Sequence, residues 1–136
     1  MVEILLISHE EVGAYLLYSA ELILGSQDHA FAYSLKRGDD IEKFSKHIEV
    51  KLEELRGKKI LVLTDIFGGT PSNIVAANLK NHDYKCISGM NLPMLLEALV
   101  LRENEHLEMD ELVSKCIIAG KEGVQDIEKM MISQIK

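Results

Sequence analysis

The feature that most constrains the fold is a regular alternation of short apolar runs with longer amphipathic stretches. The apolar runs cover about residues 3–8, 30–35, 60–64 and 84–88, and stretches with helical spacing separate them. This alternation is typical of βα units stacked around a parallel sheet. The sequence therefore predicts an α/β fold, organised as a single domain over residues 1–136.

The stretches between the runs predict helices on both faces of an open sheet of four parallel strands. The first helix has an expected inward face of Val12, Leu16, Ser19 and Ile23, and it ends at Gly25. The later helices are expected from Asp39 or Asp40 to Gly57, from Pro71 to about Lys80 with Thr70 as the cap, over about 92–103 and over about 109–121.

The last segment, residues 124–136, is ambiguous. Val124, Ile127, Met131 and Ile135 have helical spacing, whereas Gly123 and the short length of the segment also allow an edge strand. Periodicity alone leaves both options open.

Composition and charge exclude several classes of protein. The formal net charge of −7 argues against nucleic acid as a partner, because phosphate backbones are bound by clustered Lys and Arg. The apolar runs are far shorter than the roughly 20 residues that span a bilayer. The amino terminus lacks the pattern of a signal peptide, so we expect a cytoplasmic protein. Cys86 and Cys116 lack CxxC spacing and are expected to be small buried side chains.

Two polar side chains follow strands that are expected to be neighbours. In an open parallel sheet, reactive groups gather at the carboxyl ends of the strands, where the strand order reverses. With strand order 2-1-3-4, His9 at the end of the first strand faces Asp65 at the end of the third. A carboxylate that holds one imidazole nitrogen leaves the other free as a nucleophile.

The turn that follows Asp65 can bind an anion. Gly68 and Gly69 let the backbone approach a ligand closely, Thr70 offers a hydroxyl, and Pro71 suits the first turn of a helix. The helix amino terminus adds N–H groups and a favourable dipole. Together with His9, this pattern favours phosphoryl transfer.

Other polar residues are weaker candidates for the edge of this site. Lys36 and Arg37 follow the second strand and could meet an acidic partner or the phosphoryl group. Asn91 follows the fourth strand, although capping of the next helix explains it equally well. His29, His47, His82 and His106 are expected to be solvated, without an acid and a glycine turn assembled around them.

Four segments resemble the IIA proteins of mannose-type (mannose, fructose and sorbose) phosphoenolpyruvate-dependent sugar phosphotransferase systems, and the resemblance spans nearly the whole chain. They are residues 4–9 (ILLISH), 63–73 (LTDIFGGTPSN), 89–95 (GMNLPML) and 119–124 (AGKEGV).

The resemblance implies a phosphotransferase component with a phosphohistidine intermediate. His9 would take a phosphoryl group from HPr and pass it to a IIB protein or domain, which supports sugar uptake through the membrane components IIC and IID. Asp65 would orient His9, Gly69 and Thr70 would bind the phosphoryl oxygens, and neither a metal nor a cofactor would take part. The resemblance also implies a homodimer that exchanges its carboxy-terminal edge strand between subunits.

One residue departs from the family pattern. Family members commonly have glycine after the histidine, whereas this chain has Glu10 and a second acid, Glu11. If both acids point to solvent at the start of a helix, they complement its dipole. The departure bears on partner choice and phosphohistidine lifetime more than on the reaction.

Three other readings compete with this one. A receiver domain would be phosphorylated on Asp65, but receivers carry an acidic pair where this chain has Ser8 and His9. The phosphotransfer subunit of dihydroxyacetone kinase also uses a histidine after its first strand, and the DIFGGTP segment favours sugar transport over it. A flavin-binding module would need a Ser/Thr-rich loop after the first strand.

Overall fold

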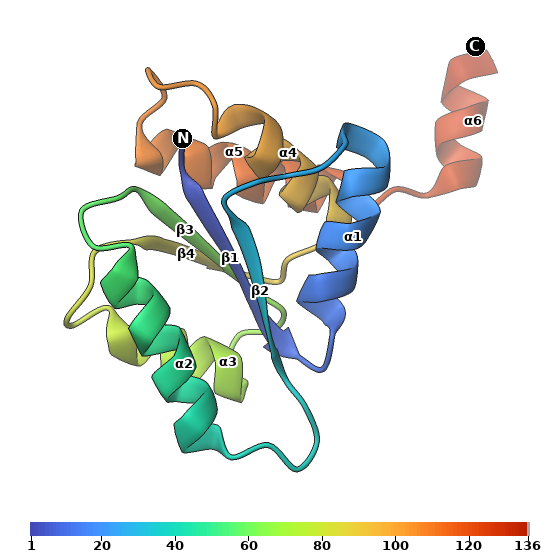
Figure 1. The fold of residues 1–136 in the computed structure, drawn as a ribbon. Coiled ribbons are helices and arrows are strands. Elements are labelled where there is room, and N and C mark those ends of the chain that lie inside the picture. The colour runs from blue at the N-terminus through green and yellow to red at the C-terminus, as the bar shows by residue number, and fades with distance from the viewer. Residues whose placement is uncertain (136) are drawn as a thin grey trace.

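A computed structural model describes residues 1–135. These residues form four strands and six helices, arranged as in Figure 1. The predicted elements are confirmed to within about two residues at most ends. One cap differs, because Gly69 precedes the third helix and Thr70 is its first residue. The elements are β1 (Glu3–His9), α1 (Val12–Leu24), β2 (Ala30–Leu35), α2 (Ile41–Glu54), β3 (Ile60–Thr64), α3 (Thr70–Asn78), β4 (Lys85–Ser88), α4 (Leu92–Leu101), α5 (Met109–Glu122) and α6 (Ile127–Ile135).

The four strands form one parallel sheet in the order β2-β1-β3-β4, as predicted. The register pairs His9 with Leu35 on β2 and Ile7 with Thr64 on β3. The carboxyl ends of β1, β2 and β3 therefore lie at one edge of the sheet.

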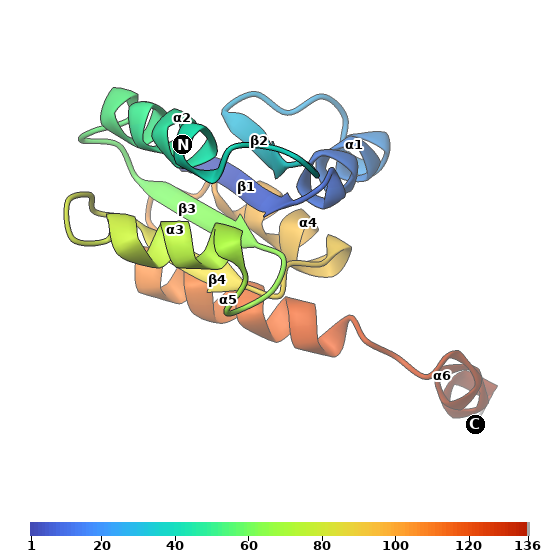
Figure 2. The same cartoon turned by 90° about the horizontal axis from the view of Figure 1, so that it is seen from below.

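Helices cover both faces of the sheet, as expected. Figures 1 and 2 show α1, α4 and α5 on one face and α2 and α3 on the other. Ile4 and Leu6 of β1 pack into the first layer, while Leu5 and Ile7 pack into the second. Because both faces of β1 are buried, its sequence is a continuous apolar run and does not alternate with polar residues.

The predicted inward face of α1 is wrong for three of its four residues: Leu16 packs against the core, but Val12, Ser19 and Ile23 are exposed. The buried residues of this helix are Gly13 and Ala20. A Cβ atom on Gly13 would lie 3.0 Å from Cβ of Leu6, so the helix approaches the sheet through its smallest residue. A prediction from the spacing of large apolar side chains therefore put the inward face of α1 in the wrong place.

In this single chain the tail forms a helix, α6. Figures 1 and 2 show α6 apart from the sheet and its covering helices, and every described residue from 121 to 135 is exposed. The exchange of this segment between subunits stays a prediction, since the structure holds one chain. Within residues 1–135, no helix is long and apolar enough to cross a membrane.

Cys116 is buried as expected, whereas Cys86 on the edge strand β4 is exposed.

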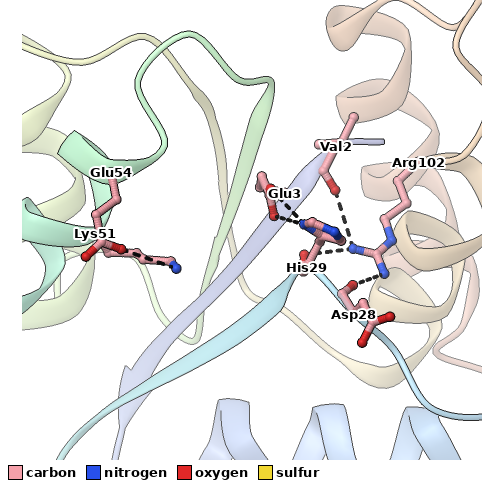
Figure 3. Close-up of polar contacts among 7 residues, drawn as sticks. All are labelled: Val2, Glu3, Asp28, His29, Lys51, Glu54 and Arg102. Atoms are coloured by element: carbon pink, nitrogen blue, oxygen red, sulfur yellow. Dashed lines mark hydrogen bonds and ion pairs between the residues drawn. The ribbon is translucent and has the colours of Figure 1, made fainter.

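A buried arginine ties together the amino-terminal ends of β1 and β2 (Figure 3). Arg102, directly after α4, is 3% exposed and donates hydrogen bonds to the backbone oxygens of Val2, Asp28 and His29. Its Nε atom is buried without a partner in the part of the chain that the structure describes. Burial lowers the pKa of Arg102, and the nearby carboxylates of Glu103, Glu3 and Asp28 oppose that change.

The His29 side chain is 52% exposed, in line with the expectation that it is solvated, yet it also contacts an acid. Its Nδ1 atom lies 2.9 Å and 3.1 Å from the two carboxylate oxygens of Glu3, whose side chain is buried (Figure 3). The two residues are 26 positions apart, and only the pairing of β1 with β2 brings them together.

We predict that Arg102→Met lowers the free energy of unfolding by about 3 kcal/mol or more, because buried carbonyls lose their donor and Glu3 loses a countercharge. Urea denaturation measures this change. Arg56→Met is the control, since Arg56 is exposed and pairs with Glu53 on the surface, and it should change stability little. Equal losses in the two variants would contradict a clamping role for Arg102.

Candidate functional site

The structure brings His9 and Asp65 together at the carboxyl ends of β1 and β3, as the strand order predicts. His9 Nδ1 lies 2.9 Å from Asp65 Oδ2, and the backbone N–H of His9 donates to the same oxygen at 2.9 Å. A carboxylate only accepts hydrogen bonds, so Nδ1 carries the proton when the ring is neutral. The other nitrogen, Nε2, is then an unprotonated nucleophile.

Asp65 is itself held in place. Its second oxygen, Oδ1, accepts the backbone N–H of Ile66 at 3.0 Å, and its side chain is 14% exposed while that of His9 is 44% exposed. The carboxylate is thus fixed from two sides, and the imidazole that it orients stays open to a reaction partner.

The glycine turn lies close to the His9 ring. A Cβ atom on Gly69 would lie 3.3 Å from Nε2 of His9 and only 2.6 Å from Cε1, and the second distance is closer than a side chain tolerates. Gly68 has a φ of +88°, in the region that favours glycine. Gly68 is therefore required by the shape of the turn, and Gly69 is required by the space that the His9 ring occupies.

The amino end of α3 lies beside the free nitrogen of His9. Within the described chain this helix begins at Thr70 without a side-chain cap, and Pro71 occupies its first turn. Uncapped N–H groups and the positive end of the helix dipole attract an anion. A nucleophilic nitrogen next to an anion-binding helix end has the geometry needed to accept a phosphoryl group.

Lys36 and Arg37 contact the two acids that follow His9, and their place at the edge of the site stays a prediction. Lys36 Nζ is 3.1 Å from Glu11 Oε1, and the backbone N–H of Arg37 donates to Glu10 Oε1 at 3.0 Å. The β2–α2 loop is therefore attached to the β1–α1 loop that follows His9.

Both side-chain polar atoms of Asn91 make hydrogen bonds within the fold. Its Oδ1 atom accepts the backbone N–H of Met94, which caps α4, and its Nδ2 atom donates to the carbonyl of Gly120 on α5. The capping alternative given in the sequence analysis is thus the one that the structure supports.

Ser8 and Phe67 are two residues near the site that sequence reasoning missed. The buried hydroxyl of Ser8 donates to the carbonyl of Glu10 and accepts the N–H of Gly13, which fixes the loop after His9. Phe67 is 84% exposed in the turn after Asp65. A small polar residue that ends a buried strand, and an aromatic residue next to two glycines, were the available signals.

No group of three or more His, Cys, Asp or Glu side chains that could hold a metal occurs among residues 1–135. A cavity of about 530 Å³ lies at the opposite ends of β3 and β4, where Ile60 and Lys85 line it.

Comparisons with known proteins find relatives of one family. The family described as PTS system fructose IIA component matches residues 3–117. The chain is 32% identical over 124 residues to the mannose-specific EIIAB component of Escherichia coli. The matched residues are 89% of this chain but 38% of that protein. The chain thus spans less than half of that relative. The fructose-specific EIIA component of Bacillus subtilis is 28% identical, with 92% of this chain and 86% of the relative covered.

Solved structures show the same fold. The phosphotransferase system component EIIA from Streptococcus agalactiae has a TM-score of 0.85 and 31% identity, with 95% of this chain and 99% of that chain covered. The mannose/sorbose-specific IIA subunit from Enterococcus faecalis has a TM-score of 0.83 and 27% identity, with 92% and 93% covered.

We predict that Gly69→Ala displaces the His9 ring and breaks its hydrogen bond to Asp65, because the added Cβ would overlap Cε1. The ¹⁵N chemical shifts of the imidazole report this change. Gly68→Ala is the matched control: it strains a positive φ by about 1–2 kcal/mol but has open space for its Cβ, so the ring signals should stay. Unchanged His9 shifts in Gly69→Ala would refute the steric argument.

Proposed function

This chain belongs to the mannose-type IIA family of sugar phosphotransferase systems, and we propose that it is a phosphoryl carrier whose phosphorylated residue is His9. The donor is phosphorylated HPr and the acceptor is a IIB protein or domain, in the cytoplasm. The IIB partner then serves sugar uptake by the membrane components IIC and IID. The observation that carries the proposal is the His9–Asp65 contact at the amino end of α3.

The transfer moves one phosphoryl group between two imidazoles. The lone pair of His9 Nε2 attacks phosphorus, the bond from phosphorus to the donor nitrogen breaks, and the donor imidazole leaves with that electron pair. The His9 ring gains positive charge while Nδ1 keeps its proton, and the Asp65 carboxylate stabilises this charge at 2.9 Å. No redox change occurs, and the proposal includes neither a cofactor nor a metal, as the family resemblance implies.

The amino end of α3 binds the phosphoryl oxygens in this proposal. Backbone N–H groups of the first turn, reached through Gly68 and Gly69, and the Thr70 hydroxyl donate to the three equatorial oxygens. These donors are preorganised by the turn, so they need no rearrangement during transfer.

The exposure of the site supports a protein partner. A carrier must expose its phosphorylated nitrogen to two partners in turn, and the His9 side chain is 44% exposed. Phe67 and Ile66 next to it are exposed apolar residues, the kind that a protein interface buries.

We predict that His9→Gln abolishes labelling of the chain by ³²P-phosphoenolpyruvate in the presence of enzyme I and HPr, because the nucleophile is lost. Asp65→Asn should keep the labelled residue but slow the transfer by roughly 10²-fold, since a neutral amide does not stabilise the imidazolium. Rapid-quench labelling and peptide mapping measure rate and position. Full labelling of His9→Gln would overturn the proposal.

The stability of the label separates the alternatives. Phosphohistidine survives base and is lost in acid, whereas an acyl phosphate on Asp65, as in a receiver domain, hydrolyses in base. Transfer onward to a dihydroxyacetone kinase, and not to a IIB protein, would instead favour that system.

We further propose that the chain forms a homodimer through its tail. The apolar residues Ile127, Met131 and Ile135 recur at a spacing of four along α6, and all three are exposed in the single chain. β4 has one neighbour, β3, so its other side is an open edge. Both features would be covered if the tail packed against a second copy.

We predict that the full chain sediments as a dimer and that a chain ending at residue 123 sediments as a monomer, because the exposed apolar face is removed. Analytical ultracentrifugation at several concentrations measures this. The double variant Ile127→Ser, Met131→Ser tests the same face without shortening the chain. A dimer of unchanged stability in the shortened chain and in the double variant would contradict the proposal.

A further inference from the structure

Glu10 has a backbone conformation that glycine adopts more easily. Its φ is +47°, in the left-handed region, where a side chain is disfavoured. Two hydrogen bonds hold it there: its N–H donates to the carbonyl of Leu35 at 2.8 Å, and its carbonyl accepts the hydroxyl of Ser8 at 3.2 Å. The backbone strain of a glutamate at this position, one residue after the nucleophile, must be offset by contacts that its side chain makes.

The Glu10 side chain turns toward the β2–α2 loop. Its Oε1 atom accepts the backbone N–H of Arg37 at 3.0 Å and lies 3.9 Å from Arg37 Nε. The next acid, Glu11, pairs with Lys36 at 3.1 Å, and this hydrogen bond raises the pKa of Lys36, which keeps it charged. Each acid after His9 is thus matched by a cation from the same neighbouring loop.

The charges around His9 make this matching relevant to phosphoryl transfer. Asp65 contacts the ring, Asp39 accepts the N–H of Lys36, and Asp40 caps α2, so carboxylates are numerous at this edge. An anionic phosphoryl group that approaches His9 would be repelled by unpaired charge on Glu10 and Glu11. Lys36 and Arg37 are the cations that face these two acids.

Resting on the proposed function, we propose that Glu10 is a positioning residue that anchors the loop of residues 36–38 beside His9, and that Arg37, aided by Lys36, supplies the countercharge that lets an anionic phosphoryl donor approach. Arg37 is 98% exposed, so its charge faces any partner that docks over His9. At the position after the nucleophile, where glycine would fit the backbone, this chain thus has an ion pair between Glu10 and Arg37. This ion pair affects the rate at which His9 is phosphorylated.

The test is a double-mutant cycle with Arg37→Gln and Glu10→Gln. Glu10→Gln removes the charge but keeps an oxygen that can accept the Arg37 N–H. Arg37→Gln alone should lower kcat/KM for phosphorylated HPr about two- to fivefold at low salt, because Glu10 is left unpaired. In combination with Glu10→Gln, the loss should disappear.

Two further measurements separate charge from structure. The effect of Arg37→Gln should shrink at about 1 M salt, where the Debye length is roughly 3 Å. Arg37→Lys keeps the charge and should keep the rate. Arg56→Gln is the matched control, because the exposed Arg56–Glu53 pair lies on α2 and its following loop, away from His9, and should leave the rate unchanged.

Each outcome has a distinct meaning. An equal loss from Arg37→Gln with and without Glu10→Gln, or no loss at any salt, overturns the countercharge role while labelling of His9 persists. If the chain without substitutions is not labelled on His9 by phosphorylated HPr, the proposed function itself is overturned.

Discussion

The structure depends above all on the position of β1 between β2 and β3, with both of its faces buried. Ile4 and Leu6 pack into one helical layer and Leu5 and Ile7 into the other, so a single strand joins the two halves of the core. Its parallel register with β2 and β3 then fixes where the chemistry lies, because His9, Asp65 and the loop after Leu35 must leave the sheet at one edge. The packing of four apolar side chains thus determines the geometry of polar residues beyond them.

The parts of the fold that could be predicted from the sequence depend on strong local signals. Continuous apolar runs mark β1 and β3, and Asp40 and Gly57 bracket α2. The inward face of α1 could not be predicted, because Gly13 makes the close contact with the sheet and a residue without a side chain gives no periodic signal. The tail stayed ambiguous for a different reason: every described residue of α6 is exposed, so burial does not distinguish helix from strand and periodicity alone had to decide.

The candidate site, too, has parts that could be predicted from the sequence and parts that could not. The pairing of His9 with Asp65 follows from strand order, and the glycine turn follows from residue types, so both were accessible before the structure. The contacts of Glu10 with Arg37 and of Glu3 with His29 were not, because each joins loops or strand ends that are 26 or 27 positions apart. They depend on side-chain directions and on two left-handed residues, Glu10 and His29, which no sequence spacing encodes.

The two ends of β1 present the same pair of groups in different surroundings. At the amino end, Nδ1 of His29 contacts both oxygens of the buried Glu3; at the carboxyl end, Nδ1 of His9 contacts one oxygen of Asp65. A histidine–carboxylate contact is therefore insufficient to define a phosphoryl site. The difference is the uncapped helix end that Gly69 brings to the Nε2 side of His9, whereas His29 lies beside the buried guanidinium of Arg102. Arg102 already donates to backbone oxygens, so it stabilises the fold, and the free donors of α3 remain for an anion.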